Sequence, residues 1–212
     1  MNRQFEPSEL VTATDGTPYH IRIRPEALAD NVILVGDPAR VDLIAGKLDK
    51  VGDKTSNREI VSCKGEYKGK QITVLSTGMG VGCIDIVVNE LDICANVDLE
   101  KREPKPVHRS LNLIRIGTCG SLQDDLEVGT HVASAYAIGI DGLAYYYKGL
   151  EKINDEKLIE QFLKQTSWDK KLPYPYAVKA DNELLNRIAS DTHKGITITA
   201  PGFYAPQGRQ IG

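Results

Sequence analysis

The chain has 212 residues, of which 41% are hydrophobic and 26% charged, and its formal net charge is −3. This composition excludes a disordered chain, and the length suffices for one α/β domain with a sizeable core. The negative charge provides no basic field for a nucleic-acid backbone, so we expect no nucleic-acid partner. The sequence has neither a bilayer-spanning apolar run nor the apolar segment of a signal peptide. We therefore expect no membrane partner and a cytoplasmic location.

The four cysteines do not have the spacing of a metal site or a disulfide framework. Cys63, Cys83, Cys94 and Cys119 lie in apolar or glycine-rich surroundings, and none belongs to a CxxC motif. The four histidines likewise form no HxxxH pair. We expect reduced, mostly buried thiols and assign no certain metal site.

Strands and helices alternate along the chain. Apolar runs that end in turn residues predict strands, and apolar residues at helical spacing predict helices. In chain order these are a strand at 32–35, a helix at 37–48, a strand at 72–75, a helix at 84–94, strands at 111–117 and 131–142, a helix at 154–166, a strand at 176–180, a helix at 181–191 and a strand at 196–200. This order predicts a single-domain α/β fold over residues 1–212, with a mixed central β-sheet flanked by helices. The polar residues 101–110 are expected to form a solvated loop.

Four of the predicted strands are followed by glycine-bearing corners, at residues 36–37, 76–78, 117–118 and 201–202. Such sheets bind ligands at the carboxyl ends of their strands, so we expect the four corners to face one side. At the first corner Asp37 is a good helix N-cap, and Arg40 could add a donor fork to a helix N-terminus that favours anions. Taken alone, this corner is better explained as a capped turn with a solvated arginine.

Arg115 lies within an apolar strand, where an unpaired guanidinium would be very costly. Either an anion or a carboxylate of the protein would have to pair with it, and both alternatives stay open. Thr118 adds a hydroxyl just beyond the end of the same strand. Arg58 and His20 each have a plain alternative, as an exposed arginine and as a surface or internally satisfied histidine.

The stretch PGFYAPQGR, residues 201–209, places a planar amide and a planar guanidinium two residues apart beside two aromatic rings. A uracil edge presents an N–H group between two carbonyl oxygens. Gln207 could accept from that N–H and donate to one oxygen, Arg209 could donate to the other oxygen, and Phe203 could stack on the ring. The amino group of cytosine would meet the arginine donors and be repelled. A surface loop is the alternative.

These stretches together resemble the hexameric-type nucleoside phosphorylases, and within that family the members that act on uridine. The resemblance covers nearly the whole chain and rests on the order and spacing of GDPARV, REIVSCKGEYKGKQITVLSTGMGVG, RIGTCGSLQDDLEVGTHV, IGIDG and FYAPQGR. It implies phosphorolysis of uridine to uracil and ribose 1-phosphate. Inorganic phosphate would be a co-substrate, and no cofactor would be needed.

The resemblance also implies a role for individual residues. Phosphate would be held by Gly36, Arg40, Arg58, Arg115 and Thr118. The base would be bound by Phe203, Gln207 and Arg209, and the sugar by Thr118 and by His20, which would contact the 5′-hydroxyl. Arg115, Gln207 and Arg209 would carry the catalysis.

Some of the implied contacts cross between subunits. Arg58 and His20 would complete the site of a neighbouring subunit, which implies a homodimer or a hexamer built as a trimer of dimers. Glu59 and Ser76 resemble positions near a monovalent cation, such as potassium, between subunits.

Other functions stay open beside this one. A purine nucleoside phosphorylase is disfavoured by Gln207 with Arg209, and a nucleosidase by the three arginines, because a hydrolase needs no anion clamp. A non-catalytic nucleoside-binding relative is a further alternative. Family members continue with a segment that supplies a Met and a Glu near the sugar, so we expect this chain to be incomplete at its C-terminus. The activity of these 212 residues alone, and any use of deoxyuridine or thymidine, are left open.

Overall fold

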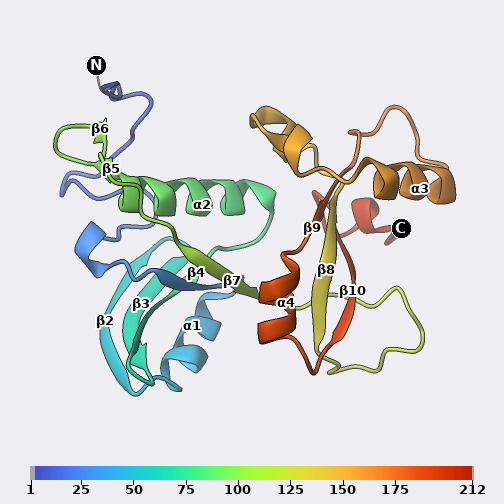
Figure 1. Cartoon of the computed structure of the whole chain (residues 1–212), viewed down its shortest axis with the longest axis horizontal. Helices are drawn as coiled ribbons and strands as arrows, with labels where there is room; N and C mark the ends of the chain where they lie inside the picture. Colours follow the sequence, from blue (N-terminus) through green and yellow to red (C-terminus); the bar gives the residue numbers. More distant parts are fainter. Residues whose placement is uncertain (1–2, 212) are drawn as a thin grey trace. The chain divides into compact units, whose positions relative to one another are not determined.

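The computed structural model describes residues 3–211 and divides the chain into two compact units, which meet in sequence between Cys119 and Gly120. Both units combine mixed β-sheets with flanking helices (Figure 1). The predicted α/β fold class is therefore confirmed. The strands are divided among sheets of five, three and two strands, whereas the sequence predicted one central sheet. The boundaries of a single domain over residues 1–212 stay a prediction, and each unit is described by itself.

The first unit contains a five-stranded sheet with the strand order β2-β3-β4-β1-β7. Strand β1 pairs in parallel with both β4 and β7, whereas β2, β3 and β4 pair antiparallel. The elements of this unit are η1 (Pro25–Ala27), β1 (Asn31–Val35), α1 (Pro38–Ala45), β2 (Lys50–Asn57), β3 (Ile60–Tyr67), β4 (Lys70–Ser76), α2 (Val81–Asn96), β5 (Val97–Asp98), β6 (Glu103–Pro104) and β7 (Asn112–Ile116).

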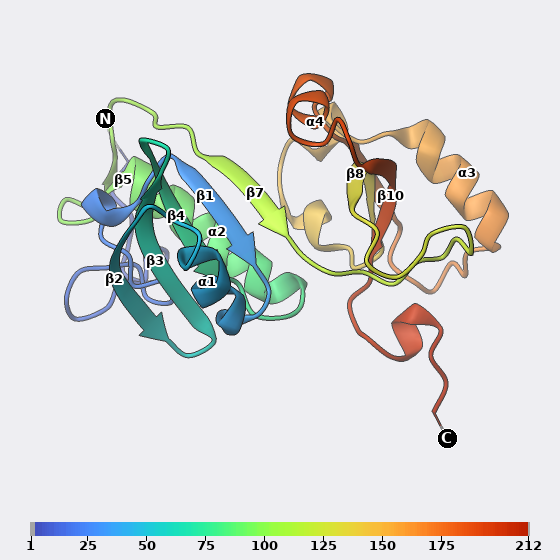
Figure 2. The ribbon, with the colours of Figure 1, turned by 90° about the horizontal axis from the view of Figure 1, so that it is seen from below.

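Side chains alternate along β1 between two hydrophobic cores on opposite faces of the sheet. Val32 and Leu34 join the core that includes Leu91 of α2. Val35 joins the core that includes Val41 of α1. Figures 1 and 2 show the two helices on opposite faces of the sheet. Burial on both faces explains why the sequence of β1 is a continuous apolar run without alternation.

The start of α1 agrees with the sequence. The side chain of Asp37 accepts a hydrogen bond of 2.9 Å from the backbone N–H of Ala39, and Pro38 is the first helical residue. An N-cap carboxylate and a proline at this position both suit the unpaired N–H groups of the first turn. The connection from β1 into the helix is therefore locally encoded.

The hairpin formed by β2 and β3 was not predicted. Strand β2 reads KVGDKTSN, and six of its eight residues are exposed. With no apolar alternation, its pairing comes from the ladder with β3 and not from its own burial. Arg58 and Glu59 form the two-residue loop between the strands, so Arg58 lies at the tip of a hairpin.

The prediction that residues 101–110 form a solvated loop is confirmed only in part, because six of the ten residues are exposed but the segment also contains a short strand and an anchored arginine. Residues 103–104 form β6, and the Arg102 guanidinium donates to the carbonyl oxygens of Phe5, Glu6 and Leu10 at 2.6–2.9 Å. These contacts attach the beginning of the described chain to the turn between β5 and β6. Their partners lie more than ninety residues away in sequence, and no local pattern indicates them.

The second unit contains a three-stranded sheet with the order β10-β8-β9, in which β10 is parallel and β9 antiparallel to β8. Its elements are β8 (Val132–Gly139), η2 (Leu143–Tyr146), η3 (Leu150–Lys152), α3 (Glu156–Thr166), β9 (Tyr176–Lys179), α4 (Asn182–Ile188), β10 (His193–Thr199) and η4 (Ala205–Gln207). Ile159 of α3 packs against Ile138 and Ala177, and Phe162 and Trp168 border this core.

The cysteines are free thiols, but only two of the four are buried, whereas the sequence predicted mostly buried thiols. Cys63 and Cys94 are buried, Cys83 is half-buried and Cys119 is exposed. Burial raises the pKa of the Cys94 thiol to about 12. Within residues 3–211 there is no cluster of three metal-ligating side chains. Over the same residues, no helix has both the length and the apolarity to cross a membrane.

We predict that Ile159→Ala destabilises the second unit by about 2–5 kcal/mol, because this fully buried side chain would leave a cavity. The matched control is Ile188→Ala on α4, where the side chain is 54% exposed and the change should stay within about 0.5 kcal/mol. Urea unfolding can be followed by the fluorescence of Trp168, the single tryptophan. Equal losses in the two variants would contradict the assigned core.

Candidate functional site

Three of the four predicted glycine corners meet in the first unit. Because β4, β1 and β7 are parallel and in register, their carboxyl ends lie at one edge, with Val35 opposite both Ser76 and Ile116. A Cβ atom on Gly36 would lie 3.7 Å from the Gly78 carbonyl oxygen and 3.9 Å from Arg115 Nη2. The fourth corner, residues 201–202, belongs to the second unit, and its place beside the other three stays a prediction.

The prediction that Arg115 is buried in an apolar strand is wrong. Strand β7 is the edge strand of the five-stranded sheet, and all five of its residues, Arg115 included, are exposed. The Arg115 guanidinium folds over Gly117, and its Nη1 occupies the space that a Cβ atom there would need. It forms no hydrogen bond or ion pair with the residues that the structure describes. Its donors are therefore free for an anion at this corner.

Arg40 and Thr118 lie on the segments that follow the same strands. Arg40 is in the first turn of α1, directly after the Gly36 corner, and its side chain is half-buried. Thr118 is exposed just beyond β7. Neither side chain has a hydrogen-bond partner among residues 3–211. The N-terminus of α1 and two unpaired arginines give this corner the electrostatics of an anion site.

Arg58 and His20 lie in one side-chain cluster. Arg58 has a left-handed φ of 55°, which is strained for a residue other than glycine. Its guanidinium carbon lies 5.9 Å from the centre of the Tyr19 ring. The Tyr19 ring in turn packs edge-on against the His20 ring, at 5.0 Å between centres. The structure therefore joins two residues for which the sequence offered separate, unremarkable explanations.

Glu59 and Ser76 are also brought together. The fully buried Ser76 hydroxyl donates to the Glu59 carbonyl oxygen at 2.8 Å and accepts from the Val61 N–H at 2.7 Å. The Glu59 side chain lies against Gly78, so the hairpin loop adjoins the glycine corner. A cation at this position stays a prediction.

The three predicted base-binding residues form one cluster in the second unit. The Arg209 guanidinium carbon lies 4.0 Å from the centre of the Phe203 ring. Its Nη1 donates to Gln207 Oε1 at 2.5 Å and to the Phe203 carbonyl oxygen at 2.6 Å. Gln207 Nε2 donates to the Gly202 carbonyl oxygen at 3.2 Å. Gly208 has a φ of 73°, and this left-handed residue turns the chain so that Arg209 returns to the Phe203 ring.

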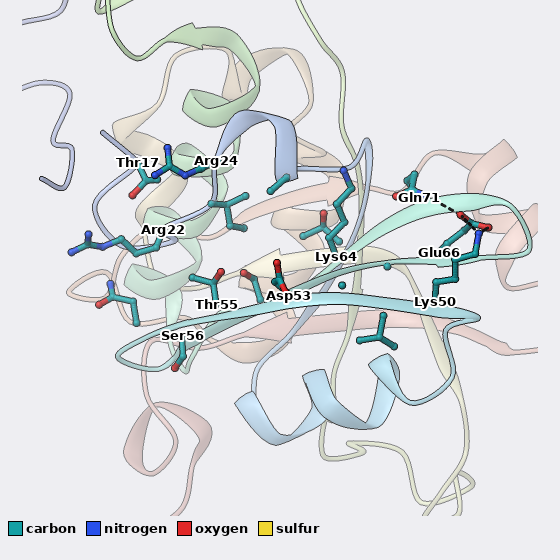
Figure 3. Close-up of a pocket in the computed structure, with 18 of the residues that line it drawn as sticks. Thr17, Arg22, Arg24, Lys50, Asp53, Thr55, Ser56, Lys64, Glu66 and Gln71 are labelled. Carbon is teal, nitrogen blue, oxygen red and sulfur yellow. Dashed lines mark hydrogen bonds and ion pairs between the residues drawn. The ribbon is translucent and has the colours of Figure 1, made fainter. Parts of the chain in front are cut away.

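A hollow of about 790 Å³ lies elsewhere in the first unit, over the polar face of β2, β3 and β4 (Figure 3). Ser62, Lys64 and Thr73 line it, and the residues next to them in sequence face α1 instead. Arg22 and Arg24 lie at one end, and the other end has an ion pair between Lys50 and Glu66. None of the predicted site residues lines this hollow. Its size alone does not identify the functional site.

Sequence reasoning missed two residues that hold the His20 segment. Glu90 of α2 accepts hydrogen bonds from His20 and Ile21, and the Asn57 amide donates to the carbonyl oxygens of Tyr19 and His20. The signal for Glu90 was available, because it lies three residues after Val87 and four before Cys94, on the apolar stripe of the helix. Asn57 lies in the unpredicted hairpin and gave no signal.

The model of the phosphorylase superfamily matches residues 30–211. The chain belongs to this superfamily. It is 27% identical to the uridine phosphorylase of Thermococcus kodakarensis, over 99% of this chain and 64% of that protein. It is 38% identical to a DeoD-type purine nucleoside phosphorylase of Bacillus thuringiensis, over 51% of this chain and 41% of that protein. The chain thus spans less than two thirds of the length of these curated relatives.

Solved structures of the family are similar to this fold. A Trypanosoma brucei nucleoside phosphorylase described as having uridine phosphorylase activity matches with a TM-score of 0.79 and 29% identity, over 96% of this chain and 72% of that one. The Vibrio fischeri uridine phosphorylase matches with a TM-score of 0.61 and 24% identity, over 91% of this chain and 68% of that one. At that identity the second match shows the fold alone.

We predict that Ser76→Ala destabilises the first unit by about 1–3 kcal/mol, because it leaves the buried Val61 N–H without its acceptor. Ser62→Ala is the matched control. This buried serine on the neighbouring strand has no side-chain hydrogen bond within the described chain, so about 0.5 kcal/mol or less is expected. Urea unfolding of both variants measures the difference. A smaller loss for Ser76→Ala than for the control would contradict the role of this hydroxyl.

Proposed function

We propose that this chain carries the phosphate- and base-binding residues of an enzyme that phosphorolyses uridine to uracil and ribose 1-phosphate. The observation that supports it best is the cluster of Phe203, Gln207 and Arg209, which combines an aromatic face with a planar amide and a planar guanidinium. These groups match the alternating acceptors and donor of a uracil edge. Membership of the phosphorylase superfamily supports the reaction class.

In the proposed complex, uracil replaces the internal hydrogen bond between Arg209 and Gln207. Gln207 then accepts from the uracil N–H, and Arg209 donates to a uracil oxygen while its guanidinium stays over the Phe203 ring. The exchange replaces one charge-assisted hydrogen bond with another and leaves no donor unpaired. The pair is thus already ordered for a planar ligand before the base binds.

Phosphate is proposed to bind at the corner formed by Gly36, Arg40, Arg115 and Thr118. Two guanidinium groups without protein partners and the N-terminus of α1 would stabilise an oxyanion there. Gly36 leaves the backbone accessible beside Arg115. Because a nucleosidase needs only water, the two unpaired arginines favour phosphate as the second substrate.

The proposed reaction separates charge and then recombines it. The C1′–N1 bond breaks with its electron pair leaving on the base, and a phosphate oxygen forms the new bond to C1′. Donors at Arg209 and Gln207 stabilise the negative charge that spreads over the uracil oxygens. Phosphate held by Arg115 stabilises the positive charge on the sugar before it bonds to C1′. The uracil anion then takes a proton from water, so no general acid at N1 is required.

His20 and Arg58 are proposed to act on the sugar and the phosphate of a neighbouring copy, in a homodimer or a hexamer. A monovalent cation at Glu59 and Ser76 is proposed to stabilise that contact. The close packing of Arg58, Tyr19 and His20 supports a shared role, because one rigid cluster can present both residues to the same ligand.

A purine nucleoside substrate is the second candidate. It is favoured by the 38% identity to DeoD-type purine nucleoside phosphorylases, which is higher than the identity to the uridine phosphorylase. That similarity covers 51% of this chain. We favour uridine because the Gln207 and Arg209 pair suits the uracil edge.

We expect this chain to release uracil from uridine when inorganic phosphate is present and not when it is absent. Uracil and ribose 1-phosphate can be measured by chromatography, with inosine and cytidine as matched substrates. Hypoxanthine release from inosine without uracil release would support the purine alternative. Uracil release without phosphate would identify a nucleosidase, and phosphate-independent binding without turnover would support a binding protein.

We predict that Arg115→Ala mainly impairs the use of phosphate and that Arg209→Ala mainly impairs the use of uridine. Arg115→Ala should raise the KM for phosphate by at least about tenfold, because it removes a charge-assisted hydrogen bond to the anion. Arg209→Ala should lower kcat/KM for uridine by on the order of a hundredfold, with little change in the KM for phosphate. Each variant serves as the control for the other. Equal effects on both substrates would indicate a structural role for these arginines.

A further inference from the structure

Glu90 is a buried carboxylate whose place in the fold the proposed reaction does not explain. It lies on α2 and is 8% exposed, and its helix neighbours Val87, Leu91 and Cys94 pack in the hydrophobic core. A carboxylate in such surroundings is costly unless donors surround it. The identity of its donors therefore indicates what the residue is for.

All the hydrogen bonds of Glu90 that the structure describes come from one short segment. Its Oε2 accepts from the backbone N–H groups of His20 and Ile21, both at 2.8 Å, and its Oε1 lies 2.5 Å from His20 Nδ1. On the carbonyl side, Asn57 Nδ2 donates to His20 O at 2.9 Å and to Tyr19 O at 3.3 Å. Side chains from a helix and a hairpin thus fix both the backbone and the ring of His20.

These contacts define the orientation of the imidazole. Because Glu90 accepts from every other neighbour, we assign Nδ1 as the N–H that donates to Oε1. In the neutral ring, Nε2 is then a hydrogen-bond acceptor. The His20 side chain is 28% exposed, and Nε2 has no partner among residues 3–211. The ring therefore presents one unused acceptor to a ligand.

We propose that Glu90 is a positioning residue that holds His20 in the Nδ1–H form, so that Nε2 accepts a hydrogen bond from the 5′-hydroxyl of the nucleoside sugar. The inference rests on the proposed function for the identity of the ligand, whereas the tautomer is a property of the protein alone. Asn57 extends the same arrangement to Arg58, which follows it in sequence. The hairpin that carries Arg58 is thus hydrogen-bonded to the His20 segment, and a carboxylate behind a histidine fixes the ring in other binding sites.

The tautomer can be tested directly on the full chain. Nitrogen-15 NMR of the imidazole, followed through a pH titration to the neutral ring, distinguishes a protonated Nδ1 from a protonated Nε2. The His20 signals are assigned with His20→Asn. We expect Nδ1–H in the wild type and a mixture with Nε2–H in Glu90→Gln. Asp92→Asn removes an exposed carboxylate from the same helix and should leave the spectrum unchanged.

The wild-type spectrum alone can overturn the proposal, because a predominant Nε2–H form would contradict the assigned hydrogen bond. The proposal therefore stays falsifiable even if Glu90→Gln fails to fold. Identical tautomers in a folded Glu90→Gln and in the wild type would also overturn it.

Turnover provides a second readout that a purely structural role would not produce. Uridine is compared with 5′-deoxyuridine, which lacks the hydroxyl that Nε2 would bind. Glu90→Gln should lower kcat/KM for uridine about three- to tenfold, the value of one hydrogen bond, and change that for 5′-deoxyuridine less than about twofold. Equal losses on both substrates would overturn the positioning of the 5′-hydroxyl.

The two readouts separate this inference from the proposed function. If no variant and no wild-type protein releases uracil, the proposed function fails, and the tautomer measurement still decides the role of Glu90. If uridine is turned over but Glu90→Gln changes neither the tautomer nor the preference for the 5′-hydroxyl, the inference fails and the proposed function stands.

Discussion

The parallel pairing of β1 with both β4 and β7 is the constraint on which the first unit depends. It places the carboxyl ends of three strands at one edge of the sheet, and this pairing alone brings together the glycine corners that follow them. The same pairing requires β1 to be covered on both faces, which α1 and α2 achieve with two separate cores. Helix α2, which packs in the first core, also carries Glu90. Helix α1, which packs in the second core, carries Arg40 in its first turn.

Polar groups in this protein differ in whether the protein itself satisfies them. The buried Ser76 hydroxyl and the buried Glu90 carboxylate are fully engaged, and both bind backbone groups of segments that carry proposed ligand-binding residues. Arg40 and Arg115, in contrast, have no partner among the described residues. This division is what a binding site requires, since buried hydrogen bonds fix the frame and free donors remain for the ligand.

The loop at residues 201–209 differs, because its polar side chains form hydrogen bonds with one another. Arg209 stacks on Phe203 and donates to Gln207, so the loop is ordered without a ligand. A planar base that offers both an acceptor and a donor can replace these contacts one for one, whereas an apolar ring could not. The selectivity that we propose for uracil therefore comes from an exchange of hydrogen bonds and not from an empty pocket.

The sequence by itself determined ten of the strands and helices in their order, the N-cap at Asp37 and the resemblance to the phosphorylase family, because apolar runs, capping and motif spacing are local properties. It also indicated Phe203, Gln207 and Arg209, which lie within seven consecutive residues. Only the tertiary structure decided that Arg115 is on an exposed edge strand, that β2 and β3 form a hairpin with Arg58 at its tip, and that Arg102, Asn57 and Glu90 bind distant backbone. These features arise from pairing and hydrogen bonds between segments far apart in sequence. The sequence of a single strand or helix does not indicate these distant partners.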